Sequence, residues 1–133
     1  MYVSRKKNSP MTQITQTPRI PDGGAVREVL DRVGDKWSLL VIGTLRGGPM
    51  RFGELEASVA GISQRMLTRT LKHLAEDGLV DRTAYAEVPP RVEYELTGLG
   101  HTLLPLVMSL AEWAMAHRDE INANRTSRMK PLS

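Results

Sequence analysis

The chain has 133 residues, 41% of them hydrophobic and 25% charged, which is the composition of a single globular domain with tails. It holds no cysteine, which excludes disulfides, thiolate metal sites and cysteine nucleophiles, and no apolar run long enough for a signal peptide or a membrane-spanning helix. The formal net charge is +3, but residues 25–117 hold ten bases against twelve acids, so the basicity comes from the tails. We expect a cytoplasmic protein whose affinity for nucleic acid depends on where charges lie within the domain.

The distribution of apolar residues predicts one folded domain between two tails. Residues 1–21 combine Arg5-Lys6-Lys7 with three prolines and show no apolar periodicity, which is typical of a disordered arm. Residues 123–133 are expected to form a flexible tail. The folded domain is therefore expected over residues 22–122.

The first half of this domain predicts four short elements. Apolar residues at helical spacing predict a helix at about 25–33. Asp35 is a suitable N-cap for a second helix at about 36–46, which is apolar nearly all round and is expected to be the buried centre. A short extended piece at 50–52 and a short helix at 54–59 follow.

The next helix, at 63–77, carries local signals at both of its ends. Ser63 is a good N-cap, and Gly78 stands where a left-handed glycine ends a helix. Leu74 and Leu79 are placed for the apolar contact of a Schellman motif. The sequence therefore specifies where this helix starts and stops.

A β-hairpin and a long helix complete the predicted elements. Residues 92–96 alternate strictly between apolar and acidic side chains, and a proline-containing break separates them from an extended stretch at 79–85. Thr97 caps a helix at 98–121. The fold class predicted by this order is mainly α with a small β-hairpin (α+β), a winged helix-turn-helix domain with flanking dimerisation helices.

The helix at 63–77 has two faces of the kind that a DNA-reading helix needs. At 100° per residue its apolar stripe faces the core, and the opposite face is polar and basic. Arginine and glutamine make bidentate contacts with base edges, and a hydroxyl at a helix N-terminus suits a phosphate. The predicted DNA-binding residues on this face are Ser63, Gln64, Arg65, Thr68, Arg69 and Lys72.

Three further basic residues are candidates for DNA contacts. Arg91, near the tip of the hairpin, is placed either to enter a minor groove or to form a surface ion pair with Glu93 or Glu87. Arg51 and Lys36 are candidates for phosphate contacts.

The last helix predicts a second copy of the chain as a partner. Its large apolar residues recur at spacings of four and three, the seam of a coiled-coil contact. This seam consists of Leu99, Leu103, Leu106, Leu110 and Trp113. The alternative is that the helix folds back entirely on its own domain. A two-fold dimer would place two recognition helices about 34 Å apart over a pseudo-palindromic site.

Nothing in the sequence indicates an enzyme. His73, His101 and His117 share no metal-ligand spacing, and there is no phosphate-binding loop or dinucleotide fingerprint. We expect no cofactor and no metal.

Six segments occur in an order that resembles the HxlR-type winged helix-turn-helix transcriptional regulators, relatives of the MarR group. They are GDKW (34–37), RFGEL (51–55), GISQRMLT (61–68), EDGLV (76–80), VPPRVEY (88–94) and LTGLG (96–100). The resemblance covers about residues 26–114. It implies a homodimeric bacterial transcription factor that reads DNA with helix 63–77 and uses the hairpin as its wing. It also implies that the first and last helices pair across the dimer, which adds Val26 and Leu30 to the dimerisation residues.

One departure from the family concerns its signal. Many members carry a cysteine at the start of the first helix that senses oxidants or electrophiles, whereas this chain has about Gly24 there and no cysteine at all. Thiol sensing is therefore excluded. The signal is either a small molecule near the dimer seam, beside Trp37 or Trp113, or there is none.

Two functions follow from the sequence. The first is a sequence-specific DNA-binding regulator, and more specifically a repressor, that acts as a homodimer. The alternative is a winged-helix adaptor whose basic stripe binds an acidic protein without sequence-specific DNA binding.

Overall fold

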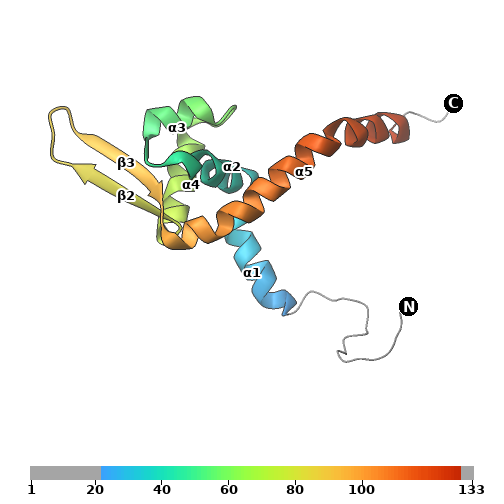
Figure 1. The fold of residues 1–133 in the computed structure, drawn as a ribbon, viewed down its shortest axis with the longest axis horizontal. Helices are drawn as coiled ribbons and strands as arrows, with labels where there is room; N and C mark the ends of the chain where they lie inside the picture. Colours follow the sequence, from blue (N-terminus) through green and yellow to red (C-terminus); the bar gives the residue numbers. More distant parts are fainter. Residues whose placement is uncertain (1–21, 130–133) are drawn as a thin grey trace. The chain divides into compact units, whose positions relative to one another are not determined.

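The computed structural model describes residues 22–129, so the predicted arm at 1–21 lies outside the described part. The described elements, in chain order, are α1 (Gly23–Val33), α2 (Lys36–Thr44), the 3-10 turn η1 (Leu45–Gly47), β1 (Met50–Arg51), α3 (Phe52–Ser58), α4 (Gln64–Glu76), β2 (Val80–Tyr85), β3 (Arg91–Leu96) and α5 (Gly98–Arg128) (Figure 1). This confirms the predicted fold class, a mainly helical winged helix-turn-helix. The chain divides into a unit that ends at Arg32 and a unit that begins at Val33.

The core of the second unit gathers apolar side chains from every element of the winged domain. α2 contributes Val41 and Ile42, which are fully buried, and α3 contributes Leu55. Further buried members are Leu45, Val59, Ile62, Leu67, Leu71, Leu74, Leu79, Val80, Leu96 and Val107. α2 is at the buried centre as predicted, but its apolar surface is not fully covered, because Leu40 is 49% exposed. α2 packs against α3, α4 and α5, and Leu40 lies outside these contacts on the exposed side of the helix.

The hairpin belongs to a three-stranded antiparallel sheet with the strand order β1-β3-β2. Val80 pairs with Leu96, Arg82 with Tyr94 and Tyr85 with Arg91. The two-residue strand β1 joins the other edge of β3, an association that the sequence did not predict. β2 and β3 project beyond the helices as a wing (Figure 1).

Both predicted ends of α4 are confirmed. The Ser63 hydroxyl oxygen accepts a hydrogen bond from the Met66 amide at 3.1 Å. Gly78 has a φ of +76°, and the Leu79 amide donates to the Leu74 carbonyl at 2.9 Å, as in a Schellman motif. Because these contacts are all local, the start and the end of α4 are each set within a few residues of the cap.

α5 starts against the end of α4. The Thr97 hydroxyl donates to the Gly78 carbonyl at 2.6 Å and accepts from the Gly100 amide at 3.0 Å. A Cβ at Gly100 would collide with the Leu79 carbonyl oxygen, so glycine lets the helix pass closely over this junction.

The predicted end of this helix at residue 121 is wrong, because α5 continues to Arg128. Residues 122–128 contain neither glycine nor proline, and Arg125 and Arg128 lie in the last turn, where cations stabilise the helix dipole. Residues 123–129, predicted to be part of the flexible tail, are therefore largely helical, and 130–133 lie outside the described part. No helix within residues 22–129 is long and apolar enough to cross a membrane.

Candidate nucleic-acid interface

The structure brings the predicted DNA-reading residues together on the outer face of α4. Leu67, Thr70, Leu71 and Leu74 point into the core and are buried. The residues of the opposite face are all exposed: Ser63, Gln64, Arg65, Thr68, Arg69 and Lys72. The partition between a buried and an exposed side of this helix is therefore as predicted.

The polar groups on this face differ in how freely they can meet a ligand. The Thr68 hydroxyl donates to the Gln64 carbonyl at 2.9 Å, so its hydrogen is already used and its oxygen is left as an acceptor. Within residues 22–129, Arg65, Arg69 and Lys72 make no ion pair with any carboxylate. These three cations are thus available to an external anion without breaking a contact in the described structure.

Lys36 and Arg51 lie away from this face, on other elements. The Lys36 ammonium lies 4.7 Å from the centre of the Trp37 ring, so it is held over an aromatic face. Arg51 precedes α3, and its amide donates to the Glu54 carboxylate at 2.8 Å. In the sheet Arg51 is paired with Glu93, which places it on the same side of the sheet as an acidic residue.

Arg91 forms the surface ion pairs that were the alternative to a minor-groove contact. Its guanidinium donates to Glu87 at 2.7 and 3.2 Å and to Glu93 at 2.7 Å. It also stacks on Tyr85, with 3.8 Å from the guanidinium carbon to the ring centre. The hydrogen bond from Arg91 holds the pKa of the Glu87 carboxyl below its usual range, and the same pairing raises the pKa of Arg91. Arg91 is thus the first residue of β3, with its charge matched locally, rather than a free cation at the wing tip.

A groove beside α4 contains residues that sequence reasoning missed. It has a volume of about 500 Å³, and its walls come from α3, α4, β2 and β3. The lining residues are Phe52, Gln64, Thr68, Leu71, Lys72, Ala75, Glu76, Arg82 and Tyr94. Arg82 has the same strand parity as the buried Val80, a signal in the sequence that places it on the side of the hairpin facing α4.

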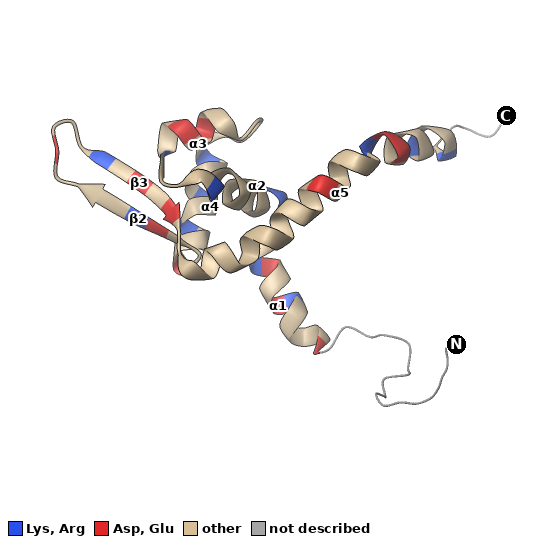
Figure 2. Ribbon diagram, in the orientation of Figure 1, with Lys and Arg blue, Asp and Glu red and all other residues tan. Residues whose placement is uncertain are grey.

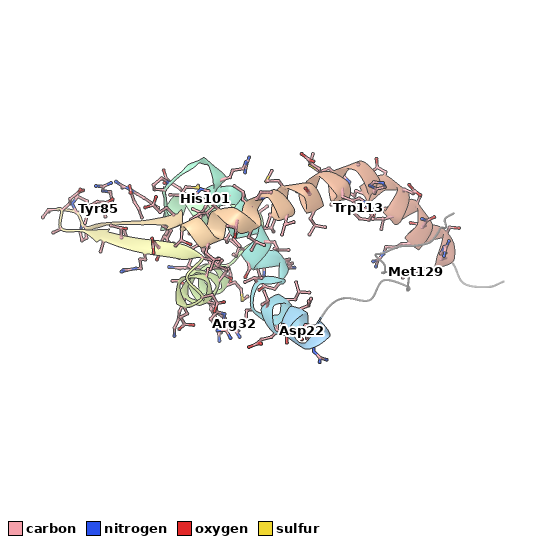
Figure 3. All side chains as sticks on the ribbon, turned by 60° about the horizontal axis from the view of Figure 1, so that its bottom comes forward. Asp22, Arg32, Tyr85, His101, Trp113 and Met129 are labelled. Atoms are coloured by element: carbon pink, nitrogen blue, oxygen red, sulfur yellow. The ribbon has the colours of Figure 1, made fainter. Side chains whose placement is uncertain are left out.

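The predicted dimerisation residues of α5 divide into two groups. Leu103 is half-buried and packs against the core of its own chain, as do Leu104 and the buried Val107. Leu106 is 66% exposed, Leu110 52% and Trp113 53%. Figure 3 shows Trp113 on the part of α5 that extends beyond the core. The helix therefore folds onto its own domain along one side and exposes an apolar stripe along another.

α1 also carries exposed apolar side chains, taken by itself. Leu30 and Val29 are each 56% exposed, whereas Val26 is half-buried. Both helices that the sequence assigned to dimerisation thus have uncovered apolar surface.

The two tryptophans near which an effector was predicted lie in different surroundings. Trp37 is half-buried and packs against the core, and Trp113 stacks on His117 with 4.6 Å between ring centres. The groove described above involves neither of them. Residues 22–129 hold no group of three or more metal-ligating side chains.

Comparison with known proteins decides what this arrangement is. Residues 32–122 match the family model described as HxlR-like helix-turn-helix. The chain belongs to this family. An HTH-type transcriptional regulator of Methanothermobacter thermautotrophicus is 46% identical over 89 residues, which cover 67% of this chain and 68% of that protein. The HTH-type transcriptional regulator YtfH of Escherichia coli is 36% identical over 124 residues, covering 89% of this chain and 98% of that one.

A solved structure leads to the same conclusion. The redox regulator HypR in its reduced form has a TM-score of 0.69 and 40% sequence identity, covering 74% of this chain and 98% of its own. This HxlR-family protein is accordingly a DNA-binding transcriptional regulator of the winged helix-turn-helix type. Unlike a regulator that works through thiols, it contains no cysteine to oxidise.

Proposed function

We propose that this HxlR-family protein is a homodimeric repressor that reads a pseudo-palindromic operator with α4 of each protomer. The observation that supports this most directly is the outer face of α4. It presents Arg65, Arg69 and Lys72 with no carboxylate partner among the described residues, on a helix whose two ends are fixed by Ser63 and Gly78. A rigid helix with free cations suits the major groove of duplex DNA.

Ser63, Gln64 and Thr68 complete the reading face of α4 in this proposal. Gln64 suits an adenine edge, and the methyl group of the exposed Thr68 suits a thymine methyl. Lys36 and Arg51 are proposed as phosphate contacts outside the helix. Arg91 acts by holding the wing in shape through Glu87 and Glu93.

The dimer is supported by the uncovered apolar stripe on α5. Between Gly98 and Ala111 this helix carries no Lys, Arg, Asp or Glu (Figure 2). Leu106, Leu110 and Trp113 together form a surface that water would otherwise solvate, and covering it with a second copy releases that water. Val26 and Leu30 of α1 are proposed to join the same contact, and Leu103 to support it from the core side.

We infer repression from the small size of the protein. A compact dimer that occupies a promoter blocks RNA polymerase without a further domain that would have to contact the enzyme. The protein then works in the cytoplasm, where its DNA lies. A small-molecule signal, if the protein has one, is expected near the dimer contact, since ligands there alter the spacing of the two reading helices.

Two measurements on the purified chain test this proposal. Fluorescence anisotropy compares a duplex selected from a random pool with its scrambled counterpart across a salt titration, and light scattering gives the mass of the free protein. We expect a preference of about 10³-fold or more, a log–log salt slope of several units, and twice the 14.8 kDa chain mass. Weak and equal binding to both duplexes would instead support the adaptor.

A further inference from the structure

The wing offers DNA two sides of opposite electrostatic character. Alternation along the paired strands places Asp81, Glu93, Glu95 and Arg91 on one side, and Arg51 of β1 shares that side because it pairs with Glu93; three acids against two bases give −1. The other side, which faces α4, carries Val80, Arg82, Ala84, Val92, Tyr94 and Leu96. Arg82 is therefore the one charged residue on the α4-facing side of the β2–β3 hairpin.

The tip of the wing does not provide a cation either. Residues 86–90 are Ala, Glu, Val, Pro and Pro, and Figure 2 shows an acidic segment at the tip, with both basic and acidic segments on the adjoining strands. Arg91 beside the tip is matched by two carboxylates and stacked on Tyr85 (Figure 3 labels Tyr85 near the tip). A polyanion such as DNA thus meets a net negative charge at the tip and on the outer side of the hairpin, and a positive charge on the side that carries Arg82.

Arg82 lies in the groove next to α4 together with Lys72. Both residues line this space of about 500 Å³, one from the strand and one from the helix, and within residues 22–129 neither forms an ion pair. The lining between them is largely apolar, with Leu71, Ala75 and the ring of Tyr94. A cation on each of two walls of a largely apolar groove suits a chain of phosphates linked by sugars.

We propose that Arg82 and Lys72 form a clamp for the backbone of one DNA strand in the groove between α4 and the wing. This inference rests on the proposed function, since α4 must bring the duplex to the groove. The groove is continuous with the reading face because Gln64 and Thr68 belong to both. Glu76 lines it one helical turn beyond Lys72 and repels phosphate there, so the strand passes at the Lys72 level of the helix.

The clamp predicts a specific effect of Arg82→Gln. Each phosphate contact contributes about 0.9 to the slope of log affinity against log salt concentration. If the two proteins have equal affinity at 1 M salt, losing one contact weakens binding by about 8-fold at 0.1 M salt. For a dimer with two such contacts the slope falls by about 1.8. Selected and scrambled duplexes should weaken alike, because a phosphate contact reads no sequence.

The experiment titrates salt against anisotropy for the wild type, Arg82→Gln, Arg82→Lys and Arg118→Gln. Arg118 is an exposed arginine of α5 paired only weakly with Asp119 at 3.5 Å, so its variant makes the same charge change away from the groove. We expect the slope to fall in Arg82→Gln, to be largely restored in Arg82→Lys, and to be unchanged in Arg118→Gln. Circular dichroism melting verifies that each variant is folded.

An unchanged slope and affinity in a folded Arg82→Gln overturns the clamp and leaves the groove to a ligand other than DNA. Arg65→Ala and Arg69→Ala, measured alongside, separate this failure from a failure of the proposed function. If they reduce specific binding while Arg82→Gln does not, only the clamp is wrong. If the wild type shows no preference between duplexes, the reading function is wrong as well.

Discussion

Replacing Arg69 by alanine isolates the reading function of α4 from its stability. The side chain is exposed in the middle of the helix and makes no ion pair within the described residues. Alanine is the best helix former, so the change should alter the free energy of unfolding by less than about 0.5 kcal/mol. Any large effect on DNA binding is then a lost contact with DNA and not a lost fold.

The size and position of the effect follow from helix geometry. A bidentate contact with a base pair contributes about 1–3 kcal/mol, which is about 5- to 160-fold in affinity, and a dimer loses it in both half-sites. Arg65 and Arg69 are four residues apart, or about 6 Å along the axis. Base pairs are stacked about 3.4 Å apart, so the two arginines should read positions about two base pairs apart in each half-site.

Selection of binding sites from a randomised pool measures this directly. Arg69→Ala should relax the base preference at one position in each half-site, and Arg65→Ala at another about two base pairs away. Arg118→Ala, which removes the same charge from α5, serves as the matched control and should leave every preference intact. The reasoning fails if both α4 variants select the same site as the wild type with equal stringency.

Three further outcomes are expected. Gly100→Ala should lower the free energy of unfolding by about 1–3 kcal/mol in a denaturant titration, because its Cβ meets the Leu79 carbonyl; Gly98→Ala, which meets nothing within 4 Å, should be neutral or stabilising, and equal effects would contradict the close approach. Leu110→Glu places a charge on the exposed stripe of α5 and should give a folded monomer by light scattering; a dimer of unchanged affinity would show that this stripe is not the contact. Glu87 has a lowered pKa, so its pairing stabilises the fold above the ordinary glutamate pKa of 4.5 and is lost as pH falls through its folded value. The melting temperatures of the wild type and Glu87→Gln should therefore begin to converge as pH falls below 4.5 and meet once the carboxyl is protonated in the folded protein as well, and a gap that stays constant throughout this fall would rule out the contribution.

The pairing of Arg91 shows what a local pattern leaves open. From the sequence, Arg91 was equally suited to a minor groove and to an ion pair with Glu87 or Glu93. The choice depends on the curvature of the hairpin, which brings the carboxylate of Glu87 and the ring of Tyr85 to the same guanidinium. Only the folded backbone sets those distances.

The sequence by itself determined the elements whose signals lie within a few residues of one another. Ser63 and Gly78 defined α4 because a cap acts on amides and carbonyls of the adjacent turn. The alternation of residues 92–96 predicted β3 for the same reason, since side-chain parity is a property of the strand alone. The two faces of α4, and with them the candidate DNA-reading residues, followed from its periodicity.

Tertiary structure decided everything that depends on residues far apart in the chain. It attached β1 to β3, placed Arg82 and Lys72 in the lining of one groove, and packed Leu103 against the core while Leu106 and Leu110 stayed exposed. A heptad pattern predicts that apolar residues share one stripe of a helix, but it does not predict which neighbour buries that stripe. Which residues of α5 are buried depends on how α5 packs against α2. The geometry of a helix determines which of its residues lie on one apolar face, whereas the packing of the whole domain determines what that face contacts.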